Sequence, residues 1–244
     1  MGITSKKVGK YTYFFKDKKF ASLSDDALHL LFDIDNIKKT AKDIYIAGGR
    51  GSSFLYTTDH NEKLVYRHYM RGGLVGRFIK DLFFLWAKDS HRAYNEMLLL
   101  DFMQSKALPV PKALISRERR YFCFIKQDLI QEQIDRTQNL CQILSVRSLS
   151  KRNYEDIIKT IIRLYKANVV HTDLNIKNIL IDDKDMVYII DFDKCFIKNN
   201  IDKNDLNNMF MRLLRSFDKE HNLHMNNFYY DKDMFKSLVL SYLK

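Results

Sequence analysis

The sequence has little cysteine, which limits the kinds of site it can build. Its three cysteines, Cys123, Cys141 and Cys195, are far apart and form no Cys-x-x-Cys pair. Neither a disulfide framework nor a structural zinc site is therefore indicated. Because 46% of the 244 residues are hydrophobic, the chain can bury a full core without such supports. We expect a globular protein of a reducing, cytoplasmic compartment.

Signals for membrane spanning or lipid attachment are also missing. No stretch approaches about 18 uninterrupted apolar residues, the length that indicates a transmembrane helix. Residues 1–7 lack the apolar core of a signal peptide, and Lys6 stands where a myristoylation signal requires Ser or Thr. We therefore expect a protein that does not span a membrane, although it can still lie on one.

Positive charge is in excess. Lys and Arg number 41 against 30 Asp and Glu, which gives a formal net charge of +11. This balance predicts an anionic partner, which can be a nucleic acid, an acidic lipid or a phosphorylated substrate. Charge alone does not choose among these three classes.

One segment has the residue types and spacing of a kinase catalytic loop. Residues 171–178 are His-Thr-Asp-Leu-Asn-Ile-Lys-Asn, which matches the pattern His-x-Asp-Leu-x-x-x-Asn. In that pattern the Asp accepts the proton of the attacking hydroxyl and the Asn holds a magnesium ion. Asp173 and Asn178 fill these positions. Two apolar runs within residues 178–190 flank a polar turn and predict a β-hairpin that ends at Asp191, where a second metal-holding Asp belongs.

These residue types suit phosphoryl transfer. An alcohol needs a carboxylate within hydrogen-bonding reach, and a triphosphate needs hard oxygen ligands that hold Mg²⁺ beside it. A lone His-x-Asp is more often a hydrogen-bonded turn, but here the fixed offsets, the hairpin and the terminal Asp coincide. We therefore predict Asp173, Asn178 and Asp191 as catalytic residues, with Asn178 and Asp191 as magnesium ligands and ATP as the phosphoryl donor.

The amino-terminal half has the strand order of an ATP-binding sheet. Residues 43–47, 54–57 and 63–67 are predicted strands, and a glycine-rich turn joins the first two. Glycines let the backbone approach phosphates closely, and small side chains leave N–H groups free to bind phosphate oxygens. Because glycine hairpins are common, this signal is weak without the downstream motif. The predicted nucleotide-binding residues of the turn are Gly48, Gly49, Arg50, Gly51 and Ser52.

A cation in the third strand should reach the nucleotide phosphates. Arg67 is predicted for this role, with Lys63 and Arg71 as rivals, and the alternative is that Arg67 is a solvated strand residue. A helix expected at residues 90–105 carries Glu96. In a kinase this Glu pairs with the phosphate-binding cation, and otherwise Glu96 is an exposed helix acid.

The whole pattern predicts an α+β, bilobal protein-kinase-like fold. A small, mostly antiparallel β N-lobe is expected at residues 1–130 and a mainly helical C-lobe at residues 131–244. Residues 71–86 mix basic and bulky apolar side chains, and we expect them to be core in preference to a stripe that lies on a membrane. Further expected elements are a strand or basic arm in residues 1–20, helices at 24–32, 134–148, 153–165, 206–219 and 231–243, strands at 112–116 and 121–125 joined by a basic loop, and a hinge at 127–130.

Several features of protein kinases are missing. Thr172 stands where a protein kinase has Arg, Asn175 replaces the Lys two residues after the catalytic Asp, and Asp193 replaces the Gly of Asp-Phe-Gly. No Ala-Pro-Glu segment frames a peptide platform. A small-molecule or saccharide hydroxyl is therefore the expected acceptor, and Asp193 either assists metal binding or caps the following turn.

Four segments together carry a more specific pattern. They are Arg-His-Tyr-Met-Arg-Gly-Gly-Leu-Val-Gly at 67–76, Arg-Ala-Tyr-Asn-Glu at 92–96, Leu-Pro-Val-Pro at 108–111, and the catalytic loop. In this combination the chain resembles the bacterial 3-deoxy-D-manno-octulosonic acid (Kdo) kinase family. The resemblance implies an ATP-dependent kinase that phosphorylates the 4-hydroxyl of Kdo on a lipid A precursor in lipopolysaccharide biosynthesis, at the cytoplasmic face of the inner membrane of Gram-negative bacteria.

The residues fit this implication. A Kdo-bearing lipid A precursor carries a carboxylate and phosphates on a membrane, so the excess of positive charge suits both this acceptor and an anionic membrane surface. Arg212 and Arg215, three residues apart on a predicted helix, are candidates to meet these anions, and the alternative is a solvated helix face. We expect peripheral membrane attachment, no nucleic acid partner and no obligate protein partner.

Other functions fit part of the pattern. A lipopolysaccharide heptose kinase has the same centre with a different sugar, and a small-molecule kinase of the aminoglycoside or choline type comes next. A catalytically silent binding protein or a nucleic-acid binder would use the basic surface without chemistry. Such a pseudokinase should have lost Asp173, Asn178 or Asp191, and none is lost. Binding to nucleic acid would weaken steeply with salt.

Overall fold

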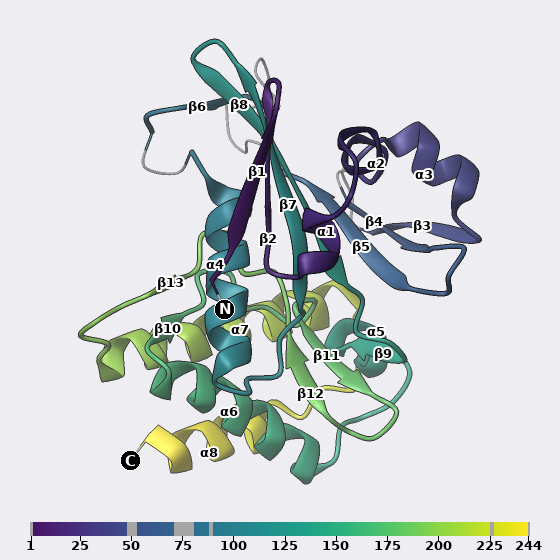
Figure 1. Cartoon of the computed structure of the whole chain (residues 1–244). Coiled ribbons are helices and arrows are strands. Elements are labelled where there is room, and N and C mark those ends of the chain that lie inside the picture. The colour runs from purple at the N-terminus through teal and green to yellow at the C-terminus, as the bar shows by residue number, and fades with distance from the viewer. Residues whose placement is uncertain (1, 48–52, 71–80, 88–89, 225–226, 244) are drawn as a thin grey trace. The chain divides into compact units, whose positions relative to one another are not determined.

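The chain divides into two compact units. The first consists of residues 1–101 and 112–133, and the second of residues 102–111 and 134–244. The sequence-based boundary near residue 130 differs from this division chiefly in residues 102–111, which belong to the second unit. The structure is a computed structural model that describes residues 2–47, 53–70, 81–87, 90–224 and 227–243 (Figure 1).

An antiparallel sheet forms the centre of the first unit. Its strands are ordered β1-β2-β7-β8-β5-β4-β3, and the short strand β6 also pairs with β8. The strands predicted at 43–47, 54–57 and 63–67 are confirmed, and residues 4–15 form a hairpin, which decides against a basic arm. The strands are β1 (Thr4–Val8), β2 (Tyr11–Phe15), β3 (Asp43–Ala47), β4 (Ser53–Thr57), β5 (Lys63–His68), β6 (Phe83–Phe84), β7 (Ala113–Tyr121) and β8 (Phe124–Glu132).

Three short helices and one long helix accompany this sheet. The helix expected at 24–32 is confirmed: the Ser24 hydroxyl caps it by accepting the N–H of Ala27 at 3.2 Å, and Leu28 is buried. The sequence patterns do not predict α1 and α3, because four and seven residues are too few for a clear helical period. The helices are α1 (Lys18–Ala21), α2 (Asp25–Leu30), α3 (Ile34–Thr40) and α4 (Arg92–Ser105).

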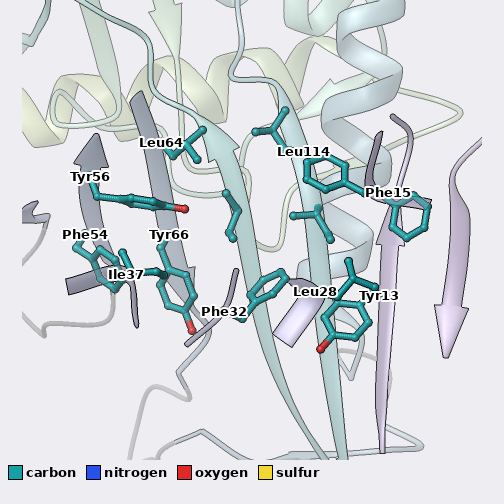
Figure 2. Close-up of a cluster of buried hydrophobic side chains, with 13 residues drawn as sticks. Tyr13, Phe15, Leu28, Phe32, Ile37, Phe54, Tyr56, Leu64, Tyr66 and Leu114 are labelled. Atoms are coloured by element: carbon teal, nitrogen blue, oxygen red, sulfur yellow. The ribbon is translucent and has the colours of Figure 1, made fainter. Parts of the chain in front are cut away.

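The two faces of the sheet have separate hydrophobic clusters. On one face, Phe32 lies between Tyr13 and Tyr66, with ring centroids 5.8 and 6.3 Å away (Figure 2). On the other face, Met97 of α4 packs in a cluster with Leu129 of β8. Burial of one such side chain contributes about 1.5–3 kcal/mol. The clusters therefore fix α2 and α4 against the sheet.

The structure corrects two expectations in β7 and β8. Residues 117–120 continue the strand, and the hairpin turn comes at residues 122–123 instead. The charge that suggested a loop is paired within the sheet, since Arg117 Nη2 donates to Asp128 at 2.7 Å. The hinge prediction at 127–130 is wrong as well. These residues lie in β8 between β5 and β7, where both edges of the backbone are already paired.

The second unit is mainly helical. Its long buried helix α6 begins at Lys151 after a capping box of Ser150 and Asn153. The hairpin predicted within residues 178–190 is confirmed as the antiparallel pair β11 and β12. The elements are β9 (Thr137–Asn139), α5 (Leu140–Leu144), α6 (Lys151–Lys166), β10 (Val169–Val170), β11 (Ile179–Asp182), β12 (Val187–Ile189), β13 (Phe196–Ile197), α7 (Lys203–His224) and α8 (Lys232–Leu243).

The basic and apolar stretch at residues 71–86 is only partly described, because residues 71–80 lie outside the described ranges. Phe83 is buried, as packing into a core predicts, whereas Trp86 is 72% exposed, so the core expectation is wrong for that residue. Every helix that the structure describes is too short or too polar to cross a bilayer.

Candidate active site

The catalytic-loop segment of the second unit lies between β10 and the β11–β12 hairpin. The backbone N–H of Ile190 donates to the carbonyl of Asn178 at 2.9 Å, which joins the two ends of the hairpin. The Asn178 side chain in turn donates through Nδ2 to the carbonyl of Asp173 at 3.0 Å. Because Asp191 follows Ile190 directly, these two bonds bring the backbones of the three predicted catalytic residues together.

His171 connects the two predicted catalytic aspartates. Its Nδ1 accepts the backbone N–H of Asp173 at 3.2 Å, so the ring proton lies on Nε2, which donates to the carbonyl of Ile190 at 3.2 Å. Burial lowers the pKa of His171 more than the charges of Asp191 and Asp173 raise it. The imidazole is therefore neutral, and it positions the catalytic loop against the segment that carries Asp191. The sequence pattern marked His171 only as part of a motif.

The backbone at Asp191 is in an uncommon conformation. Its φ is 65°, in the left-handed region, which costs a residue with a side chain about 1 kcal/mol or more. Asp is among the few residues that enter this region readily. β12 ends at Ile189, so this turn changes the direction of the chain where the predicted metal ligand stands. Such local strain is typical of residues that a functional site holds in place.

The donor set fits magnesium. The Asn178 amide uses Nδ2 to hold the carbonyl of Asp173, which leaves its oxygen as the group for a metal, and Asp191 supplies a carboxylate. Mg²⁺ is held by few protein oxygens and keeps positions for phosphate and water oxygens. Within the described ranges, no group of three or more His, Cys, Asp and Glu side chains is placed to hold a metal. The pair of Asn178 and Asp191 stays a prediction.

Helix α7 supports the catalytic loop at two points. The N–H of Ile176 donates to Ser216 Oγ at 3.1 Å, and Lys177 pairs with Glu220 at 2.6 Å. Ser216 and Glu220 are four residues apart, so they lie on one face of the helix. No motif in the sequence points to these two residues, because a Ser and a Glu on an amphipathic helix have many possible uses.

The proline segment at residues 108–111 contacts the end of the β11–β12 hairpin. The backbone N–H of Ile189 donates to the carbonyl of Pro109 at 3.1 Å, next to the turn at Asp191. From the sequence this segment was recognisable as a break after a helix and as part of a family pattern. Its contact with β12 gives it a further role, which is to hold the end of the hairpin.

In the first unit, Arg67 and Glu96 form a buried ion pair. Arg67 Nη1 lies 2.8 Å from Glu96 Oε1, and the Glu96 side chain is 1% exposed. Tyr69 donates its hydroxyl to the other carboxylate oxygen, and its ring centre lies 5.4 Å from the Arg67 guanidinium. The alternative of an exposed Glu96 is therefore wrong. The sequence reasoning missed Tyr69, although its place two residues after Arg67 puts it on the same side of the chain.

Strand register places Arg67 at the edge of the sheet where β3 ends and β4 begins. Ala47 pairs with Ser53, and Ser53 pairs with Arg67, so these three residues lie in one row across the sheet. Lys63 is exposed at the other end of β5. The predicted loop residues Gly48, Gly49, Arg50, Gly51 and Ser52, and the rival cation Arg71, lie outside the described residues and stay predictions.

Replacing Arg67 with Met is expected to weaken ATP binding by about tenfold or more, because a hydrogen bond to a charged phosphate contributes about 1.5–3 kcal/mol. Arg67→Lys should retain part of the affinity, since it keeps the charge and loses the planar fork. Lys63→Met, on the same strand, is the matched control and should change the affinity by about twofold at most. Titration with a fluorescent nucleotide measures all three. A loss of nucleotide affinity in Lys63→Met, with none in Arg67→Met, would mean that Lys63 and not Arg67 contacts the phosphates.

Comparison with known proteins shows what the chain is related to. Residues 36–234 match the model of the lipopolysaccharide kinase (Kdo/WaaP) family. The chain belongs to this family. The 3-deoxy-D-manno-octulosonic acid kinase of Vibrio cholerae is 36% identical to the chain over 174 residues, 71% of this chain and 73% of that protein. The protein of the same name from Vibrio parahaemolyticus is 37% identical over 198 residues, 81% and 82% of the two chains.

A more distant relative of the same name, from Haemophilus influenzae strain 86-028NP, is 32% identical over 221 residues, 86% of this chain and 88% of that protein. A solved structure, that of the Cydia pomonella granulovirus kinase PK-1, is 17% identical with a TM-score of 0.43, over 68% of this chain and 57% of that chain.

Membership in the lipopolysaccharide kinase family confirms the resemblance that the four sequence segments carry. The protein is a phosphotransferase that acts on a hydroxyl group. The α+β architecture is confirmed too, with an antiparallel sheet in the first unit and a mainly helical second unit. Membership in a kinase family implies ATP as the phosphoryl donor.

Proposed function

We propose that the protein transfers the γ-phosphate of ATP to the 4-hydroxyl of Kdo on a lipid A precursor. One observation carries the proposal: His171 and Asn178 hold the backbones of Asp173 and Asp191 together, in a chain whose relatives are named Kdo kinases. The hydroxyl of a sugar needs a general base to lose its proton during attack. An exposed carboxylate held by a rigid backbone supplies one.

The residues divide the work of the transfer between them. Asp173 accepts the proton of the sugar hydroxyl as its oxygen attacks the γ-phosphorus, and ADP leaves from the opposite side. Asn178 and Asp191 hold the magnesium ion that neutralises charge on the triphosphate. Arg67, kept in place by Glu96, brings its positive charge to the nucleotide phosphates.

The acceptor and the place of action are proposed together. A Kdo-bearing lipid A precursor is anionic and lies in a membrane, so we propose that the protein works peripherally at the cytoplasmic face of the bacterial inner membrane. Arg212 supports an anionic acceptor. It is exposed on α7, and its charge contributes to the lowered pKa of His171, which puts it near the catalytic loop. Arg215 is exposed one turn further along the same helix.

Phosphate transfer from ATP to a Kdo-bearing lipid A precursor tests the function, beside the same lipid without Kdo. We expect transfer only to the Kdo-bearing lipid, only with Mg²⁺ present, and at the 4-position when the product is analysed by NMR. If the protein binds ATP but transfers phosphate to neither lipid, the proposal that Kdo is the acceptor is overturned. A heptose-bearing lipid and soluble sugars would then be the next acceptors to assay.

A further inference from the structure

One end of the sheet in the first unit carries a group of exposed aromatic side chains. β6 pairs with β8 next to the β7–β8 turn, and the N–H of Arg120 donates to the carbonyl of Lys10, in the β1–β2 turn, at 2.8 Å. Three segments that are distant in the sequence therefore meet at this end (Figure 1). We name this surface the aromatic tip, and it consists of Phe84, Trp86, Phe122 and Phe124 with the cations Lys10, Arg119, Arg120 and Lys126.

Three of these four rings are exposed, and Phe124 is partly buried. Phe122 is 96% exposed, Trp86 72% and Phe84 40%. The ring of Phe84 contacts those of Trp86 and Phe124 edge-on, with centroids 5.3 and 5.5 Å apart. Phe122 has a φ of 47°, a turn conformation that suits Gly or Asn better than an aromatic residue. Neither packing nor turn geometry explains these side chains, and a large exposed apolar patch marks a binding surface.

Strand register puts rings and cations on one side of the sheet. Phe84 and Tyr121 both pair with Phe124, and Arg119 pairs with Lys126. Residues paired across an antiparallel sheet point to the same side, and so do residues two apart on one strand. The side chains of Phe84, Phe124, Arg119 and Lys126 thus form one continuous surface, to which the turn adds Phe122.

The cations of the tip lie against aromatic rings. The Arg119 guanidinium is 4.6 Å from the ring centre of Tyr121, and the ammonium groups of Lys126 and Lys10 are 5.6 and 5.8 Å from it. Of the four tip cations, only Lys126 has an ion-pair partner among the described residues, namely Asp81 at 2.6 Å. The surface therefore combines exposed rings with a net positive charge.

We propose that the aromatic tip is a membrane-binding surface, which inserts Trp86 and Phe122 between the headgroups of an anionic bilayer while the cations contact lipid phosphates. Aromatic rings beside Lys and Arg are typical of surfaces that bind the membrane interface. A protein interface is instead depleted of Lys, and here the most exposed ring stands at a turn among cations. A bilayer is the surface that carries the acceptor of the proposed function. The proposal rests on that function only for the reason to bind a bilayer, because the acceptor is lipid-borne.

The chain's single tryptophan makes the test direct. Trp86 is the only Trp, so the intrinsic tryptophan fluorescence of the wild-type protein reports on the tip alone. With vesicles of phosphatidylethanolamine and phosphatidylglycerol, we expect its emission to shift to the blue and to be quenched by brominated acyl chains. Vesicles of phosphatidylcholine alone should bind much more weakly, because the cations lose their anionic partners. Sedimentation with anionic vesicles while the emission stays unchanged would mean that another surface binds, and would overturn the proposal.

Substitutions test whether the aromatic tip, and not another exposed apolar surface, binds the vesicles. Trp86→Ser combined with Phe122→Ser should lower the partition coefficient by about tenfold or more, because two rings no longer leave water. Val146→Ser combined with Leu223→Ser is the matched control, since these side chains are 74% and 65% exposed in the second unit. Sedimentation measures the partitioning, and circular dichroism verifies folding. Equal partitioning of both double variants overturns the proposal. A wild-type protein that forms a dimer, when the tip variant cannot, overturns it too, because the tip would then be a contact between two copies of the chain.

The assay of kinase activity distinguishes this inference from the proposed function. On a water-soluble Kdo saccharide the tip variant should have the wild-type rate, and on a vesicle-borne acceptor it should be slower. If the wild-type protein binds vesicles through the tip and phosphorylates no Kdo acceptor, the proposed function fails and the inference stands. If it phosphorylates Kdo and binds no vesicles, the inference alone fails.

Discussion

Replacing Asp173 with Ala is expected to lower the rate of phosphoryl transfer by about 10²–10⁴-fold, the range that a positioned general base contributes. Nucleotide affinity should stay largely unchanged. The bond from Asn178 goes to the backbone carbonyl of residue 173, which the substitution keeps, so the predicted metal ligands retain their support. Single-turnover kinetics with a Kdo acceptor measures the rate, and calorimetry measures the binding of Mg-ATP.

Two variants serve as references for this result. Asp183→Ala removes an exposed carboxylate from the hairpin turn, where it pairs with Arg136 at 3.3 Å, and it should leave the rate close to that of the wild type. Asp191→Ala should instead impair the binding of Mg-ATP itself. A wild-type rate in Asp173→Ala would contradict the assignment of the base, and a loss of Mg-ATP binding in that variant would make Asp173 a metal ligand.

The parts of the site that short-range patterns define were predictable. His171, Asp173 and Asn178 lie in one short segment, and a hairpin leads from it to Asp191, so spacing alone predicts which residues meet. In the first unit, the order of three strands was enough to predict that β3, β4 and β5 pair as neighbours, with Arg67 opposite Ser53. These relations hold because hairpins connect neighbours in the sequence to neighbours in space.

The features that the sequence did not predict depend on contacts between residues that are far apart in the chain, or on whether an apolar side chain is buried or exposed. Nothing near Ile176 in the sequence points to Ser216 as the acceptor of its N–H. Arg117 suggested a loop because its partner Asp128 lies across a hairpin whose turn was misplaced. Trp86 was assigned to the core on hydrophobicity, which does not distinguish a core residue from a binding surface.

Asp128 is the centre of a buried polar network across three adjacent strands. It is 1% exposed and accepts hydrogen bonds of 2.7 Å from the Tyr66 hydroxyl, His68 Nδ1 and Arg117 Nη2. His68 Nε2 faces Asp81 at 3.2 Å, so both ring nitrogens donate to carboxylates and the ring is charged. Burial alone would lower the pKa of His68, but Asp128 and Asp81 outweigh it and raise this pKa. Burial would raise the pKa of Asp128, but His68 and Arg117 outweigh it and lower that pKa.

Asp128→Asn is therefore expected to lower the free energy of unfolding by about 3 kcal/mol, because it leaves two partly buried cations, 25% and 14% exposed, facing a neutral amide. Glu132→Gln at the end of the same strand is the matched control. Its pair with Lys112 is about half exposed, so its loss should cost about 1 kcal/mol or less. Urea denaturation followed by circular dichroism measures both. Arg117→Met combined with Asp128→Leu should recover part of the loss, since it removes a buried charge together with its partner.

The cost of Asp128→Asn should also depend on pH with a defined sign. The contribution of His68 is fully present below its ordinary pKa of 6.5 and is lost as the pH rises through its raised folded value. The contribution of Asp128 is present above its ordinary pKa of 3.8 and is lost as the pH falls through its lowered folded value. The difference in unfolding free energy between wild type and variant should therefore be largest between about pH 4 and 6.5. At alkaline pH the difference should fall to the part that comes from the pair of Arg117 and Asp128, because Arg117 keeps its charge.

Denaturation at about pH 5.5, 7 and 9 tests this pH dependence. A difference in unfolding free energy that stays constant to pH 9 would mean that His68 is neutral in the folded protein.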